Sequence, residues 1–186
     1  ASIVAMDANM ADFANITATG SKSTPGFGSI DQPPNERSRE DATAYDLVTN
    51  FNMGQLLPQK WGVQLPVNYG IGEQLITPEY DPVYDDLKLD DLVDAANTPE
   101  EAKQLKEQAQ DYTKRTSINL IGVRKNRTEE AEPHPYDIEN FTFNYSYNKT
   151  YHRDFEIASL LDQKVVAGVV YNYAFKPSTV EPFVKK

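Results

Sequence analysis

The 186-residue chain has no cysteine and only two histidines, His134 and His152. Without cysteine there are no disulfide bonds, thiolate metal sites or cysteine nucleophiles, and two histidines are too few for a multi-histidine metal centre. Basic residues are scarce, with 18 lysines and arginines against 28 aspartates and glutamates, so the net charge is −10. This acidity argues against a nucleic-acid-binding surface, because such surfaces concentrate lysine and arginine.

Long hydrophobic segments are also absent. No apolar run approaches the roughly 18 residues that a membrane-spanning helix needs. The chain starts without methionine, and its first basic residue is Lys22, so the basic region of a signal peptide is missing. We therefore expect a mature fragment or an excised segment.

The main pattern that is present is a two-residue alternation of apolar and polar residues, which is typical of a strand with two different faces. It is clearest over residues 61–71, 141–151 and 165–175. Weaker alternation predicts further strands at 45–53 and 116–125 and, with a possible bulge, at 3–19. The sequence therefore predicts about six antiparallel strands.

The two clearest strands have one apolar and one polar face. Their apolar faces comprise Trp61, Val63, Leu65, Val67 and Tyr69, and Phe141, Phe143, Tyr145 and Tyr147. Their polar faces include Gln64, Asn68, Thr142, Asn144 and Ser146.

Such strands suit either the core of a soluble sandwich or the wall of an outer-membrane barrel. Eleven residues of about 3.3 Å each, tilted by roughly 40°, cover about 28 Å, enough for an apolar band about 25 Å tall. Aromatic residues stand near strand ends, as at membrane interfaces. Although Pro66 cannot donate a ladder hydrogen bond, we favour the membrane. The apolar faces would then contact lipid and the polar faces the lumen.

A helical insertion interrupts the strand pattern. Thr98 can cap a helix, Pro99 suits its first turn and Glu101 can close a capping box, while apolar residues from Leu89 onward suggest a second short helix. Residues 75–115 contain 11 acidic and 5 basic residues, hence −6 of the net charge.

The expected fold is all-β with a helical insertion, an arc of a large transmembrane β-barrel, because about six strands are fewer than the roughly 8 that the smallest barrels need. Its parts are residues 1–71 (strands one to three, with a loop at 20–44), 72–115 (the acidic helical insertion) and 116–186 (strands four to six).

An ordered set of short motifs resembles the SprA (Sov) family, the giant outer-membrane translocon of the type 9 secretion system in Bacteroidetes. The matching residues run from about residue 26 to residue 154. They are Gly26-Phe27-Gly28-Ser29-Ile30-Asp31, Leu57-Pro58-Gln59-Lys60-Trp61-Gly62-Val63-Gln64-Leu65-Pro66-Val67, Pro78-Glu79-Tyr80-Asp81-Pro82, Asp90-Asp91, Ser117-Ile118-Asn119, Val123-Arg124-Lys125, Phe143-Asn144-Tyr145-Ser146-Tyr147 and Tyr151-His152-Arg153-Asp154.

The resemblance implies a bacterial outer-membrane barrel that exports folded proteins and supports secretion and gliding motility. It further implies several partners: the rest of the SprA-type barrel, a smaller PorV-type outer-membrane barrel, a periplasmic plug protein, secreted cargo proteins and membrane lipid. No nucleic-acid partner is expected, because the chain is acidic, and no cofactor is expected.

The alternative is a soluble secreted β-sandwich that binds glycans or protein partners, with Trp61, Tyr145 and Tyr147 stacking on the ligand. Nothing in the sequence predicts an enzyme, because no catalytic set converges. The acidic residues of the insertion lack the spacing of a calcium-binding loop. His152 is best explained as a hydrogen-bonded residue at a strand end.

Overall fold

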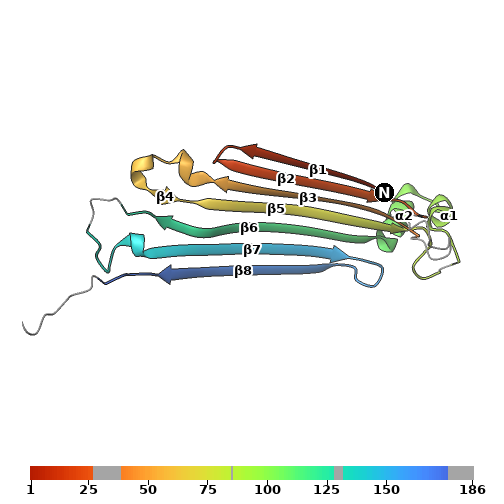
Figure 1. Cartoon of the computed structure of the whole chain (residues 1–186). Coiled ribbons are helices and arrows are strands. Elements are labelled where there is room, and N and C mark those ends of the chain that lie inside the picture. Colours follow the sequence, from red (N-terminus) through yellow and green to blue (C-terminus); the bar gives the residue numbers. More distant parts are fainter. Residues whose placement is uncertain (27–38, 85, 128–131, 176–186) are drawn as a thin grey trace, which may run out of the picture.

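The computed structural model describes residues 1–26, 39–84, 86–127 and 132–175. They form a single layer, an antiparallel sheet whose long strands lie side by side, with two short helices at one end (Figure 1). The strands are β1 (Ser2–Met10), β2 (Ala14–Ser23), β3 (Glu40–Asn52), β4 (Val63–Gln64), β5 (Pro66–Pro78), β6 (Asp111–Lys125), β7 (Phe141–Arg153) and β8 (Leu160–Tyr171).

The order of strands in the sheet follows the order in the chain, β1-β2-β3-β5-β6-β7-β8, and the two-residue β4 pairs with the end of β6. β1 and β8 are the two edges, so the sheet is open. The predicted all-β class with few helices is confirmed. The predicted count of about six strands is too low, because the described residues alone form a sheet of eight.

One of the two additional strands comes from the N-terminal segment, and the other from the division of the predicted strand over 61–71 into β4 and β5. The prediction of one bulged strand over residues 3–19 is wrong, because β1 and β2 form a hairpin whose turn occupies residues 11–13. Ala11 has a φ of 50°, and the Phe13 N–H donates to the carbonyl of Met10 at 3.2 Å. Phe13 broke the alternation because it belongs to the turn.

The predicted strand over residues 61–71 begins later than expected. Trp61 ends a short 3-10 turn, Gln59–Trp61, and Gly62 follows in the left-handed region with a φ of 62°. β4 is separated from β5 by Leu65. Pro66 is therefore the first residue of β5, a position at which proline is tolerated in a sheet.

Other boundaries also differ from the predicted ones. The strand predicted over 165–175 is observed as β8, which ends at Tyr171, so Tyr173 and Phe175 lie beyond its end. β5 continues to Pro78 and β6 starts at Asp111, which leaves residues 79–110 for the helical connection. The predicted loop at 20–44 is too long, because residues 20–23 belong to β2 and residues 40–44 to β3. Its residues 27–38, which include residues 27–31 of the family motif, lie outside the described residues.

The connection contains α1 (Leu89–Asp94) and α2 (Pro99–Ala109), both beyond the end of the sheet (Figure 1). The predicted capping box is confirmed. Thr98 Oγ1 accepts from the Glu101 N–H at 3.2 Å, and Glu101 Oε2 accepts from the Asn97 N–H at 3.0 Å. In the described parts of the chain, no helix is long and apolar enough to cross a membrane.

Few apolar side chains are buried. Among the described residues the buried hydrophobic side chains are Ala14, Leu89 and Ala109, and the last two belong to the helical connection. A sheet of this size normally buries one face against a second layer. Here neither face is covered by described residues, and the properties of the two faces decide what the chain can do.

Candidate functional site: the two faces of the sheet

The register places the predicted apolar residues on one face of the sheet. Directly paired residues of antiparallel strands have their side chains on the same side. Val67 pairs with Leu120, which pairs with Tyr145. The next row is equally apolar and contains Tyr69, Ile118, Tyr147 and Val165. We call this surface the apolar face.

The apolar face continues across the break between β4 and β5. Val63 pairs with Lys125, which keeps the side chain of Val63 on the same side as that of Val67. An open depression of about 480 Å³ brings Leu65 together with Phe143 and Tyr145. The structure thus gathers all the predicted lipid-facing residues on one side except Trp61, which lies in the preceding turn.

The apolar face is exposed. Phe143 and Tyr145 in β7 are 44% and 40% exposed, and Val165 and Val169 in β8 are 59% and 57% exposed. These are large hydrophobic side chains in regular strands rather than in loops. In the middle of the sheet, Val67 and Leu120 are partly buried by their neighbours on the same face.

Aromatic residues mark both ends of the apolar face. At the helical end, Tyr112 and Tyr151 are 6.1 Å apart between ring centroids, and the Arg153 guanidinium lies 5.4 Å from the Tyr112 ring centroid. Glu73 and Lys114 form an ion pair of 2.6 Å in the neighbouring row. At the other end Phe141 packs against Tyr171, with ring centroids 5.0 Å apart. Between these ends the face is mainly apolar.

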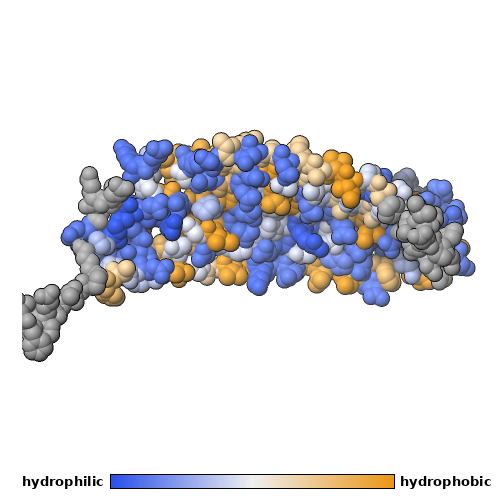
Figure 2. Space-filling model, viewed as in Figure 1, coloured by the Kyte–Doolittle hydropathy of each residue, from blue (hydrophilic) through white to orange (hydrophobic). Residues whose placement is uncertain are grey.

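The opposite surface, which we call the polar face, contains a continuous row of amide side chains. The row crosses adjacent strands at paired positions. Its members are Asn9, Asn15, Asn50, Asn68, Asn119 and Ser146. Figure 2 shows one face of the molecule, on which hydrophilic side chains predominate.

Much of this amide row is hydrogen-bonded side chain to side chain. Ser146 Oγ donates to Asn119 Oδ1 at 2.6 Å, and Asn119 Nδ2 donates to Asn68 Oδ1 at 3.1 Å. Asn68 Nδ2 donates in turn to Asn50 Oδ1 at 2.7 Å, and Asn148 Nδ2 donates to Ser146 Oγ at 3.0 Å. The three bonds between strands all run in one direction, from β7 towards β3. Asn68 and Ser146 were predicted for this face, whereas Asn50 and Asn119 were not singled out.

The other predicted polar residues have separate roles. Asn144 Oδ1 accepts from the Gly122 N–H at 2.8 Å, where β6 has a bulge and Gly122 adopts a φ of 81°. Gln64 Oε1 accepts from Arg124 Nε at 2.7 Å, and Thr142 pairs with Val170. The isolated glycine in a strand pattern was the available signal for the bulge.

The connection between β6 and β7 is held by a charged cluster that sequence reasoning missed. Arg127 pairs with Asp137 at 2.5 Å and donates to Asn140 Oδ1 at 3.1 Å. The His134 backbone N–H donates to Asp137 Oδ2 at 2.7 Å. This backbone bond, together with Arg127, lowers the pKa of Asp137 below its usual value. Tyr171 fastens β8 to the same turn through a 2.7 Å bond to the Pro135 carbonyl.

At the helical end, His152 is hydrogen-bonded on both sides. Its Nδ1 lies 2.9 Å from Thr113 Oγ1, and its Nε2 lies 3.0 Å from Asp154 Oδ2. Asp154 also accepts from the Ile157 backbone N–H, and this bond is the main reason that its pKa is lowered. The position agrees with the predicted role of a hydrogen-bonded residue at a strand end.

Comparison with protein families gives one finding. The family SprA_N, described as motility related/secretion protein, matches residues 1–93, which is half of the chain. A comparison with curated proteins finds no match.

Proposed function

The chain belongs to the SprA family of motility-related and secretion proteins, and from this we propose that it forms part of the wall of an outer-membrane protein-conducting β-barrel. In this role the apolar face contacts lipid and the polar face lines the lumen. The wall segment contributes to a type 9 secretion translocon that exports folded proteins.

The observation that carries the proposal is an uncovered apolar face on a single-layer sheet. Contiguous exposed apolar surface is unfavourable in water and marks a contact with a partner or with lipid. In a barrel wall the same alternation is required, because lipid-facing and lumen-facing residues alternate along every strand. In such a wall the half-exposed side chains of Phe143, Tyr145 and Val169 contact lipid instead of water.

The dimensions of the apolar face support a bilayer. From Phe141 to Tyr151, β7 advances ten residues, about 33 Å along the strand. A tilt of roughly 40° reduces this to about 25 Å of membrane thickness, the height of the apolar band in outer-membrane barrels. Aromatic side chains stand at both limits, as interfacial girdles do.

The polar face supplies the chemistry of a passive pore. Amide and hydroxyl groups that are already hydrogen-bonded to one another, such as Asn68, Asn119 and Ser146, offer a hydrated, uncharged surface with little affinity for any one cargo. We propose as partners the rest of the SprA-type barrel, a PorV-type outer-membrane barrel and a periplasmic plug protein. Secreted proteins would be the cargo.

The connections suggest an orientation. Outer-membrane barrels have short periplasmic turns and longer extracellular loops. The turn at residues 11–13 and the link at 53–60 lie at one end of the sheet, and the helical connection at 79–110 lies at the other (Figure 1). We propose that 53–60 faces the periplasm and that the acidic helical insertion faces the outside.

Single-cysteine labelling of neighbouring residues tests the barrel wall. This chain contains no cysteine, so Tyr145→Cys and Ser146→Cys can be introduced into the full-length protein after cysteines outside this chain are replaced. In opened outer-membrane vesicles, a membrane-impermeant maleimide should label Ser146→Cys and should label Tyr145→Cys only after detergent is added. Phe143→Cys and Thr142→Cys provide a second matched pair.

Fractionation completes the test. An antibody against residues 86–110 should detect the protein in the outer-membrane fraction. Equal labelling of both cysteines of a pair, or a protein found in the soluble or secreted fraction, would refute the barrel wall. A soluble protein would instead favour a secreted glycan-binding domain, although the described residues form one sheet and not the two that a sandwich needs.

A further inference from the structure

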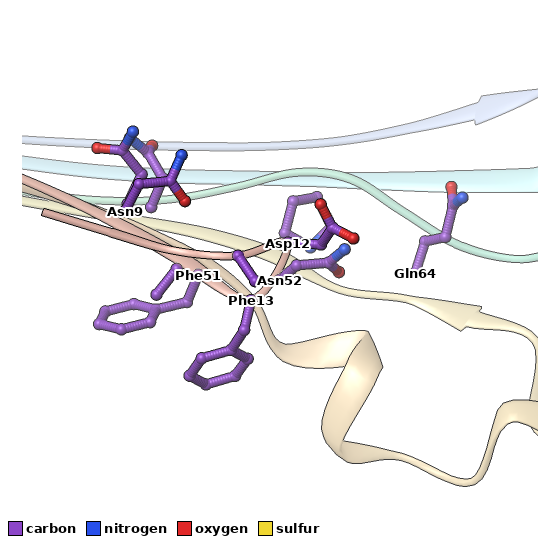
Figure 3. Close-up of a pocket in the computed structure, with 11 residues that line it drawn as sticks. Asn9, Asp12, Phe13, Phe51, Asn52 and Gln64 are labelled. Atoms are coloured by element: carbon purple, nitrogen blue, oxygen red, sulfur yellow. The ribbon is translucent and has the colours of Figure 1, made fainter.

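The amide row ends in a pocket on the polar face, beside the turn between β1 and β2 (Figure 3). Its volume is about 420 Å³, within the range of ligand pockets. Three members of the row, Asn9, Asn15 and Asn50, line it. The other polar side chains that line it are Asp12, Asn52 and Gln64.

The direction of the hydrogen-bonded row decides what the pocket presents. Each side chain donates towards β3, so Asn50 receives a bond from Asn68 through its oxygen. Its Nδ2 donor is left for a ligand. Within the described residues, the side chains of Asn9 and Asn52 also have no hydrogen-bond partner. A chain of polarised amides strengthens the terminal donor.

The pocket is nearly uncharged. Its lining includes no lysine or arginine, and Asp12 is the one ionisable side chain. Phe13 and Phe51 also line the pocket, but Figure 3 shows them projecting to the opposite side of the ribbons from Asn9 and Gln64. The side on which the amide groups lie therefore offers paired hydrogen-bond donors and acceptors, and the two rings lie on the other side.

We propose that this pocket binds main-chain peptide groups of an extended polypeptide segment at the inner wall of the pore. A peptide group has one N–H donor and one C=O acceptor, and a side-chain amide offers the complementary pair. Asp12 adds an acceptor for a further N–H. The inference rests on the proposed pore, because it places a polypeptide within reach of the polar face.

Fluorescence anisotropy on the full-length protein in detergent tests the binding. The probe is a fluorescein-labelled peptide, acetyl-(Gly-Thr-Ser)₄-amide, and its matched control has every backbone nitrogen methylated. We expect saturable binding of the first peptide only, because methylation removes the N–H donors. A labelled oligomer of N-acetylglucosamine tests the competing ligand class.

The variants are chosen so that folding is preserved. Asn9→Ala and Asn52→Ala remove side chains that have no partner among the described residues, and each should weaken peptide binding by about fivefold, the effect of one hydrogen bond of about 1 kcal/mol. Thr142→Ala, on the polar face of β7, should bind as the parent does.

Three outcomes would overturn the inference: no peptide binding, equal binding of the methylated peptide, or preferential binding of the oligosaccharide. The proposed function is judged separately by the cysteine labelling. A protein that shows the alternating labelling but binds no peptide refutes the pocket and leaves the pore intact. A protein absent from the outer membrane refutes both.

Discussion

The two faces of β7 differ in whether their side chains have partners within the sheet. On the polar face, Ser146 and Asn148 bond to each other, and Ser146 bonds across to Asn119 on β6. On the apolar face, Phe143 and Tyr145 remain 44% and 40% exposed. The polar face thus needs only water, whereas the apolar face requires a covering that the described residues do not provide. The two faces of this one strand therefore suit two different environments, which is what the proposed membrane wall requires.

The largest expected effect comes from placing a charge on the apolar face. Phe143→Arg should destabilise the membrane-inserted protein by about 2–4 kcal/mol if the site lies near the bilayer midplane. Thr142→Arg, one residue earlier on the polar face, should change the stability by less than about 1 kcal/mol. Urea unfolding in lipid vesicles measures both variants. Equal losses would remove the distinction between the faces.

A smaller loss is expected when the amide row is interrupted. Asn68→Ala removes the bond to Asn50 and the bond from Asn119, and each such bond contributes about 1 kcal/mol. We expect a loss of about 1–2 kcal/mol in the same unfolding experiment. Thr142→Ala serves as the control, since it lies on the same face outside the row. An unchanged urea midpoint of unfolding for Asn68→Ala would show that hydrogen bonds to water replace those of Asn68 without loss of stability.

The helical connection should respond independently of the sheet. Thr98→Ala removes the N-cap of α2 and should cost about 1 kcal/mol locally. Hydrogen exchange should accelerate over residues 99–109 and stay unchanged in β5 and β6. Thr98→Ser, which keeps the hydroxyl, should restore the slow exchange. Faster exchange throughout the sheet would show that the helices and the sheet unfold together.

The smallest effect is a local response to acid at the β6–β7 turn. The His134 N–H and Arg127 stabilise the Asp137 carboxylate and lower its pKa below the usual 3.8. A lowered pKa in the folded state adds stability above the unfolded pKa, and this stability is lost as the pH falls through the folded pKa. The amide of Asn140 should therefore lose exchange protection below about pH 3.8, but not between pH 5 and 8. Asp137→Asn should remove this pH dependence.

Sequence patterns predicted the local features because the cause of each lies within a few residues. The alternation from Phe141 to Tyr151 predicted β7, and Thr98, Pro99 and Glu101 predicted the start of α2. The turn at Ala11–Phe13 was missed because no glycine or proline marks it. The end of β5 and the start of β6 were missed because pairing between these two strands extends both beyond the residues that alternate.

The candidate site was predicted in part. The division of residues such as Val67 and Asn68 between two faces follows from the two-residue period and agrees with the register. The pocket beside Asp12 did not follow from the sequence, because it depends on a hairpin turn meeting the end of β5. The cluster of Arg127, Asp137 and Asn140 depends likewise on a folded turn.

The sequence by itself determined that each strand has an apolar and a polar face, because side-chain direction alternates along any extended chain. Only the tertiary structure decided that Asn9, Asn50, Asn119 and Ser146 share one row. That alignment depends on register, and a shift of one residue in any strand would move its asparagine to the opposite face. The turns and the bulge at Gly122 set the register, and the register is a relation between two strands that the alternation within either strand does not contain.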